Sequence, residues 1–133
     1  MMAEAPPHIG TIVALFAKKD KRARLLYLAS KEARRGDFCD ALLHDTRSLD
    51  LTLAKRLGPP AADVDAVLRG LGAKAHAPAY AVSDISEIDG RELPLGEALR
   101  AAVGRQRDTI VLCIGTKRAF YENHEGEQLV FSP

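Results

Sequence analysis

The pair of Asp40 and His44 is the clearest candidate for chemistry in the chain, because the two residues are four apart in the segment FCDALLHD. Side chains at this spacing share one face of a helix, so we expect the carboxylate and the imidazole to be neighbours. Such a pair can orient a general base or begin a metal site. Two ligands do not hold a metal ion. We therefore predict no metal site and no cofactor, and interpret His44 as a histidine near a helix end.

The two cysteines, Cys39 and Cys113, are far apart in the sequence, and neither belongs to a CxxC or Cys–His pair with zinc spacing. Cys113 falls within the apolar run TIVLCIG, where a free cysteine packs as a small hydrophobic residue. A catalytic thiolate would need a nearby base and partial exposure. One enzymatic alternative stays open, a small enzyme acting on a small molecule in a pocket around Cys113, His44 or His124.

The remaining motifs give no catalytic signature. The segments RGLG and CIGT match neither a dinucleotide-binding fingerprint nor a P-loop. The acidic stretch DISEIDGRELPLGE only partly resembles a calcium loop and is interpreted as a solvated turn. His124 in the tip ENHEGE, His76 and His8 are predicted to be solvated. These observations favour a binding or regulatory module over a catalyst, and no motif is specific enough to assign a family.

A basic segment, AKKDKRARLLYLASKEARR at residues 17–35, carries eight Lys or Arg and only two acidic residues. The net charge of the whole chain is +1, so the remainder is acidic. We predict one helix that begins at Asp20 and ends at Gly36. Its apolar face would contain Leu25, Leu26, Ala29 and Ala33. The predicted partner-binding residues on its other side are Lys21, Arg24, Lys31, Arg34 and Arg35.

An acidic protein surface is the favoured partner of this basic face, and nucleic acid is the alternative. Aromatic residues for base stacking are few, at 5%, and the acidic remainder would repel phosphates. The alternative without any partner is that the basic face is only the solvated side of an amphipathic helix. Reversal of Arg24, Lys31 and Arg35 to Glu is expected to abolish partner capture while leaving the melting temperature nearly unchanged. The sequence does not indicate an oligomeric state.

The length of 133 residues fits one domain, which we expect over residues 11–133 after a flexible tail at 1–10. The longest apolar run, IVALFA at 12–17, is far shorter than the roughly 20 residues that span a bilayer. The start of the chain does not resemble a secretory signal, and two cysteines do not make a disulfide-rich protein. We therefore expect a cytoplasmic protein without a membrane segment, and the abundance of Ala, Arg and Leu is compatible with a GC-rich bacterial genome.

The order of the predicted elements defines the fold class. For residues 12–17 a helix is favoured over a strand, and further helices are expected over 20–36, after Asp37, over 51–57, over 64–71 and after Pro94. Strands are expected at 79–85 and 109–115 and in the segments KRAFYEN and EQLVFS. The prediction is an α+β fold whose helical N-terminal half packs on one side of a mainly antiparallel four-stranded sheet. The strand at 109–115 should be central and that at 127–132 nearer an edge; a small α/β fold with IVALFA as its first strand is the rival.

Overall fold

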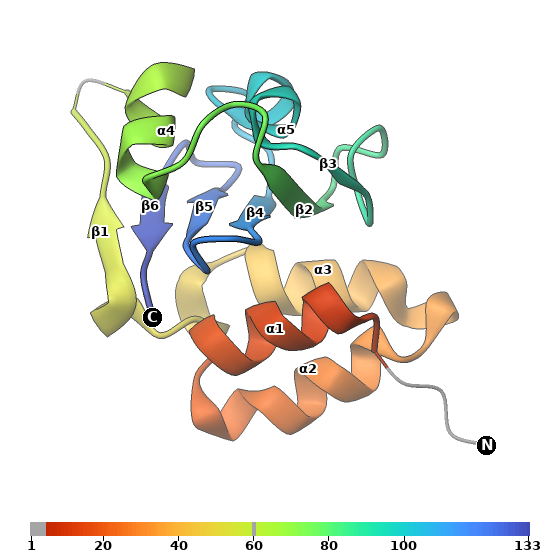
Figure 1. The fold of residues 1–133 in the computed structure, drawn as a ribbon. Helices are drawn as coiled ribbons and strands as arrows, with labels where there is room; N and C mark the ends of the chain where they lie inside the picture. Colours follow the sequence, from red (N-terminus) through yellow and green to blue (C-terminus); the bar gives the residue numbers. More distant parts are fainter. Residues whose placement is uncertain (1–4, 60) are drawn as a thin grey trace.

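A six-stranded antiparallel sheet forms the centre of the computed structural model, which describes residues 5–59 and 61–133 (Figure 1). The strand order is β1-β6-β5-β4-β2-β3. The strands are β1 (Ala54–Arg56), β2 (Pro78–Ser83), β3 (Glu92–Pro94), β4 (Thr109–Cys113), β5 (Ala119–Glu122) and β6 (Gln128–Phe131). The α+β class is confirmed, and β4 is interior and fully buried. The predicted count of four strands is wrong, because β1 and β3 are three residues long and show no periodicity in the sequence.

Five α-helices in the described residues cover both faces of this sheet. One face carries α1 (Pro7–Phe16), α2 (Arg22–Ala29) and α3 (Arg35–Leu43), and the other carries α4 (Val64–Leu71) and α5 (Leu95–Ala102) (Figure 1). Our expectation of helices on one side is therefore wrong. The reason is that the inner strands bury apolar side chains on both faces, and each face needs a cover. None of these helices combines the length and the hydrophobicity that a bilayer crossing requires.

Alternation along the strands divides the interior into two cores. Tyr80 and Tyr121 face α1–α3, whereas Val111 and Phe120 face α4 and α5. Cys113 belongs to the second core. Because successive strand residues point to opposite faces, the sheet separates Cys113 from every side chain of the α1–α3 layer.

Local signals account for the elements that were predicted correctly. The side chain of Asp63 accepts a hydrogen bond from the N–H of Ala66 and caps α4, which ends at Gly72 with a φ of +65°. The segment IVALFA is helical, as favoured, within α1. Residues 7–10, which we expected in the tail, form the first turn of α1 with Ile9 buried, and residues 1–4 lie outside the described part of the chain.

The predicted helix from residue 20 to residue 36 is in fact two helices. After α2 ends at Ala29, Lys31 adopts an extended backbone, and a 3₁₀ turn at Glu32–Arg34 leads into α3. Gly36, expected to end the helix, lies inside α3, and a Cβ added at this position would meet nothing within 4 Å. The buried residues of α2 are Leu25 and Leu28. Leu26 and Ala33, expected on an apolar face, are exposed.

The predicted helix over residues 51–57 is also wrong. Asp50 accepts hydrogen bonds from both the backbone N–H and the hydroxyl of Thr52, which closes a short 3₁₀ turn at Leu51–Leu53. The chain then runs into β1, where Ala54 pairs with Phe131 of β6. Pairing with a distant strand overrides the local helical pattern here.

Candidate functional site

Three segments that are distant in the sequence meet where β4 begins and β5 ends. Thr109 of β4 pairs with Glu122 of β5, so Asp108 and His124 lie just beyond the same end of the sheet. The C-terminal end of α3 reaches this point because the buried hydroxyl of Tyr121 donates a 2.8 Å hydrogen bond to the carbonyl of Leu43. His44 is the next residue. The fold thus brings His44, Asp108 and His124 into one cluster, the histidine cluster.

Each carboxylate oxygen of Asp108 faces a different imidazole of the histidine cluster. Oδ1 lies 3.0 Å from Nδ1 of His124, and Oδ2 lies 3.3 Å from Nδ1 of His44. The two rings stack with their centroids 4.5 Å apart and their planes 10° from parallel. Asp108 is the anchored member, since its side chain is 14% exposed and Oδ1 also accepts the backbone N–H of His124 at 2.9 Å. The imidazoles are 54% and 43% exposed and are open to solvent.

Negative charge dominates the surroundings of the histidine cluster. Oδ1 of Asp40 lies 3.7 Å from Nδ1 of His44, as the spacing in the sequence predicted, and a carboxylate oxygen of Glu125 lies 3.7 Å from Nε2 of His124. The hydrogen bond to Asp108 raises the pKa of His124, and the charges of Asp108 and Glu125 act in the same direction. Two imidazole nitrogens and a carboxylate can share a proton or a metal ion.

The residues named for an enzymatic pocket do not all meet. His44 and His124 line an open depression of about 300 Å³, whereas Cys113 is 1% exposed on the other side of the sheet. Cys39 is half-buried on α3, and burial, followed by the charge of Asp89, raises its pKa to about 11. The thiol of Cys39 is therefore protonated at neutral pH and is a poor nucleophile.

Two of the five predicted partner-binding cations are already paired. Arg35 donates Nε and Nη2 to the two carboxylate oxygens of Asp89, at 3.1 and 2.6 Å, and this pair is more than two-thirds buried. Arg34 forms an exposed ion pair with Asp37. The two hydrogen bonds to Asp89 hold Arg35 on the turn between β2 and β3 and leave its side chain little freedom to contact a partner.

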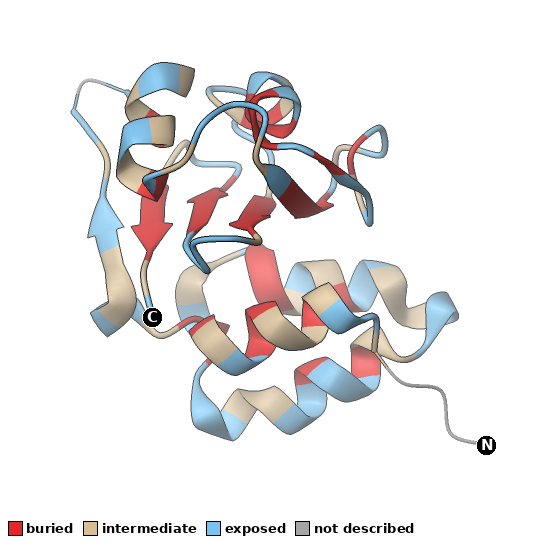
Figure 2. Cartoon of the chain, viewed as in Figure 1, coloured by how far each residue is buried: buried red, intermediate tan, exposed pale blue. Residues whose placement is uncertain are grey.

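The other three predicted cations, Lys21, Arg24 and Lys31, take part in no ion pair within residues 5–59 and 61–133. They accompany two exposed apolar side chains of α2, Leu26 at 38% and Tyr27 at 50% exposure. The ammonium of Lys31 lies 5.9 Å from the centroid of the Tyr27 ring. We call these five residues the α2 surface. Figure 2 shows that most of α2 is exposed or intermediate in burial, and Figure 1 shows that it lies on the side of the helical layer away from the sheet.

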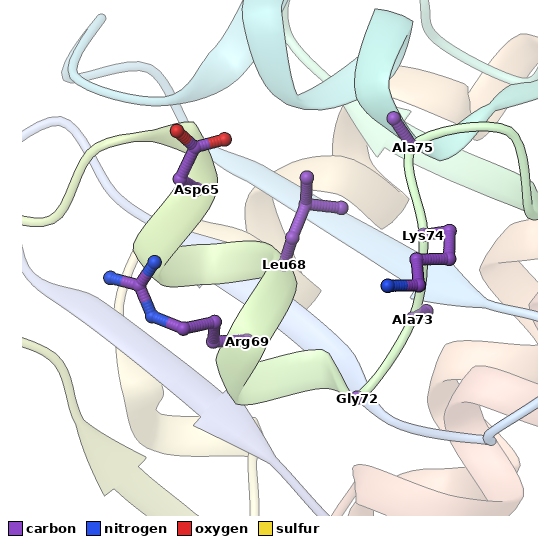
Figure 3. Close-up of a pocket in the computed structure, with 7 residues that line it drawn as sticks. All are labelled: Asp65, Leu68, Arg69, Gly72, Ala73, Lys74 and Ala75. Carbon is purple, nitrogen blue, oxygen red and sulfur yellow. The ribbon is translucent and has the colours of Figure 1, made fainter.

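A larger depression, of about 460 Å³, lies between α4 and the segment that follows it (Figure 3). Its charged side chains are Asp65 and Arg69 from α4 and Lys74 from the following segment, beside the apolar Leu68. Among the residues that the structure describes, its lining includes no imidazole, thiol or hydroxyl group. Its carboxylate and its amine are of kinds that acid–base or covalent catalysis can use, but no ion pair within the described residues joins Asp65 to Lys74.

Asp108 is the member of the histidine cluster that the sequence did not reveal. It stands directly before the apolar run of β4, and the tip ENHEGE begins at Glu122, the last residue of β5. The register of the predicted hairpin could have revealed that Asp108 lies near His124. Once residue 109 is paired with residue 122, residue 108 stands opposite residue 123, next to His124. Comparisons with protein-family models, with curated proteins and with solved structures gave no match.

Proposed function

We propose that the protein is a cytoplasmic binding module that engages an acidic protein surface through the α2 surface, defined above as Lys21, Arg24, Leu26, Tyr27 and Lys31. The observation that carries the proposal is the combination of exposed apolar side chains with cations that have no carboxylate partner in the described residues. Interfaces between proteins are enriched in Tyr and Arg and use apolar side chains at their centres. Unpaired cations around an apolar centre complement an acidic partner.

The burial pattern of α2 strengthens this interpretation beyond a solvated face. Leu25 and Leu28 point into the core and hold the helix on its neighbours. Leu26 and Tyr27 lie outside this buried set, with 38% and 50% of their surface exposed. Burying such side chains against a partner releases roughly 25 cal/mol for each Å² of apolar area removed from water. The cations at the margin would add a salt-dependent attraction and raise the rate of association.

Protein is favoured over nucleic acid because the cationic residues are few and the rest of the chain is acidic. A nucleic-acid surface neutralises many phosphates and has a strongly salt-dependent affinity. The α2 surface offers one aromatic ring and three cations that form no ion pair with another described residue. An acidic peptide with apolar residues matches this composition better than a phosphate backbone does.

The test uses labelled peptides and an oligonucleotide with defined composition. An acidic peptide that contains Leu and Phe, a peptide of Glu and Gly, and single-stranded DNA are titrated with the full chain at 50 mM and 300 mM NaCl. We expect the first probe to bind tightest and to weaken several-fold at the higher salt. Equal or tighter binding of the DNA would refute an acidic protein as the partner.

Two charge-reversal variants distinguish the contribution of the α2 surface to binding from the effect of the net charge of the chain. Lys21, Arg24 and Lys31 are changed to Glu in one variant, and exposed lysines remote in sequence are changed in a control with the same charge. The control carries K55E, K74E and K117E. The first variant should lose binding at least 10-fold, and the control should bind like the parent. Equal losses in both variants would reduce the effect to net charge and overturn the proposed surface.

A small enzyme is the second candidate, and the convergence of His44, Asp108 and His124 is the one observation in its favour. The catalytic groups would be these three, since Cys113 lies across the sheet. Turnover of activated esters and phosphoesters, compared between the parent chain and a His44→Ala, His124→Ala variant, tests this candidate. Equal rates for the two proteins would refute it.

A further inference from the structure

We propose that His44, Asp108 and His124 bind one divalent transition-metal ion such as Zn²⁺ through two imidazole nitrogens and one carboxylate. This inference is independent of the α2 surface and does not rest on the proposed function. Neutral imidazole and carboxylate are ligands that zinc and related first-row ions take in proteins. The three ligand atoms lie within 4.8 Å of one another, and no further segment has to move to assemble them.

The separations between ligand atoms fit a shared ion. Bonds of about 2.1 Å to nitrogen and oxygen place two ligands of a tetrahedral zinc ion about 3.4 Å apart. The oxygen atoms of Asp108 lie 3.3 Å from Nδ1 of His44 and 3.0 Å from Nδ1 of His124. Both contacts use Nδ1. The cluster therefore presents Nδ1 of each ring together with one carboxylate, whose Oδ1 faces His124 and whose Oδ2 faces His44. Nε2 of each ring is left to donate to solvent or a carboxylate.

The stacked imidazole rings of His44 and His124 must change their orientation when an ion binds. An imidazole lone pair lies in the plane of its ring, and the planes of His44 and His124 are 10° from parallel. The two lone pairs meet at one ion only if the rings tilt away from this stack. Both rings are about half exposed, so tilting costs little packing. Asp108, which is nearly buried and bonded to the backbone of His124, supplies the fixed ligand.

The charges around the cluster favour a cation. Asp45 and Glu127 at the same depression pair with Arg47 and Arg56, at 3.1 and 3.0 Å. Asp40 and Glu125 pair with no Arg or Lys in the described part of the chain, and each lies 3.7 Å from a ring nitrogen of the cluster. Their side chains are 74% and 78% exposed, so we assign them an attraction over distance rather than a direct bond. Positions not filled by the protein remain for water or for a ligand of the ion.

Zinc titration of the full chain tests the site directly. The protein is treated with a chelator, dialysed into a buffer that does not bind zinc, and titrated by calorimetry with ZnCl₂. We expect one Zn²⁺ for each chain. His44→Ala and His124→Ala should each weaken binding at least 10-fold, whereas the control His76→Ala, at an exposed histidine of a loop, should bind like the parent. Absence of binding at 1 mM Zn²⁺, or equal binding by parent and both cluster variants, would overturn the site.

Nuclear magnetic resonance gives a second readout that surface binding of zinc would not reproduce. The ¹⁵N resonances of Nδ1 in His44 and His124 should take the positions of metal-bound nitrogen, while their Nε2 resonances stay those of protonated nitrogen. Asp108→Asn keeps an oxygen that accepts the backbone N–H of His124, so the variant should fold, yet it should bind Zn²⁺ at least 10-fold more weakly. Metal-bound shifts at Nε2, or unchanged affinity in Asp108→Asn, would refute the assigned ligands.

Discussion

The ion pair between Arg35 and Asp89 should be one of the strongest polar contributions to stability in the described chain. Asp89 accepts two hydrogen bonds from Arg35 and a third, of 2.9 Å, from the backbone N–H of Ser83. Partial burial disfavours the charge of Arg35, but its hydrogen bonds and attraction to Asp89 outweigh this and raise its pKa. The pair therefore clamps the first turn of α3 to the segment between β2 and β3.

The magnitude follows from the geometry and the burial of this pair. Two unit charges about 4 Å apart attract by about 4 kcal/mol at an effective dielectric constant near 20. Desolvation and loss of side-chain freedom subtract from that figure, which leaves about 1.5–3 kcal/mol for a partly buried pair with two charge-assisted hydrogen bonds. The neighbouring pair of Arg34 and Asp37 is exposed, and its members are three residues apart across the start of α3, so its coupling should be only about 0.2–0.5 kcal/mol.

Double-mutant cycles on both pairs measure this difference. Arg35 and Asp89 are each changed to Ala, singly and together, and the free energy of unfolding is taken from urea titrations; the same cycle on Arg34 and Asp37 is the matched control. A coupling below about 0.5 kcal/mol for the first pair, or equal coupling for both, would refute the reasoning. Arg35→Glu should lower the melting temperature by placing a second carboxylate beside Asp89. The reversal of Arg24, Lys31 and Arg35 considered from the sequence is therefore replaced by one that spares Arg35.

Three further predictions concern reactivity and packing. Because the pKa of Cys39 is raised to about 11, iodoacetamide should alkylate this thiol about 100-fold more slowly at pH 8 than an ordinary exposed thiol. The alkylation rate, followed by mass spectrometry, should rise toward pH 10. Alkylation of Cys39 at the rate of an ordinary thiol would contradict this prediction. Glu122→Gln should cost about 1–3 kcal/mol in urea titrations, since the fully buried carboxylate accepts two backbone N–H groups; no loss would count against this account. Gly96→Ala should destabilise the fold by about 1–3 kcal/mol, because the new Cβ would lie 2.7 Å from Cβ of Ala75. Gly36→Ala, on the open surface of a helix, should stabilise the fold by about 0.5–1 kcal/mol. If both substitutions shift the free energy of unfolding in the same direction, the packing argument is refuted.

Elements with local signals at both ends were predictable from the sequence. Asp63 and Gly72 cap α4, and the β-branched run of β4 has the composition of an interior strand. Prediction failed where a distant contact decides the structure. The segment after Asp50 becomes β1 only because it pairs with β6, and the helix expected over 20–36 breaks at Lys31 before α3 docks through Arg35.

The same distinction explains which part of the histidine cluster could be predicted. Asp40 and His44 are neighbours through helical spacing alone, and the structure places them together. The contact of His44 with Asp108 depends on the register of β4 against β5 and on the hydrogen bond that holds the end of α3 to Tyr121. Neither the strand register nor this hydrogen bond can be read from a short segment of sequence. For this reason His124 was expected to be only solvated.

The helix α3 relates the two proposed sites to each other. Arg35 at its start is bonded to Asp89, and its last residue, Leu43, accepts a hydrogen bond from Tyr121, so the helix is fixed to the sheet at both ends. The helix α2 packs against α3 and carries the α2 surface on its outer side, and the histidine cluster lies at the C-terminal end of α3. A helix held at both ends does not transmit a tilt of the exposed His44 ring to α2. Zinc and an acidic partner should therefore bind independently, and the affinity of either ligand should be the same in the presence and absence of the other.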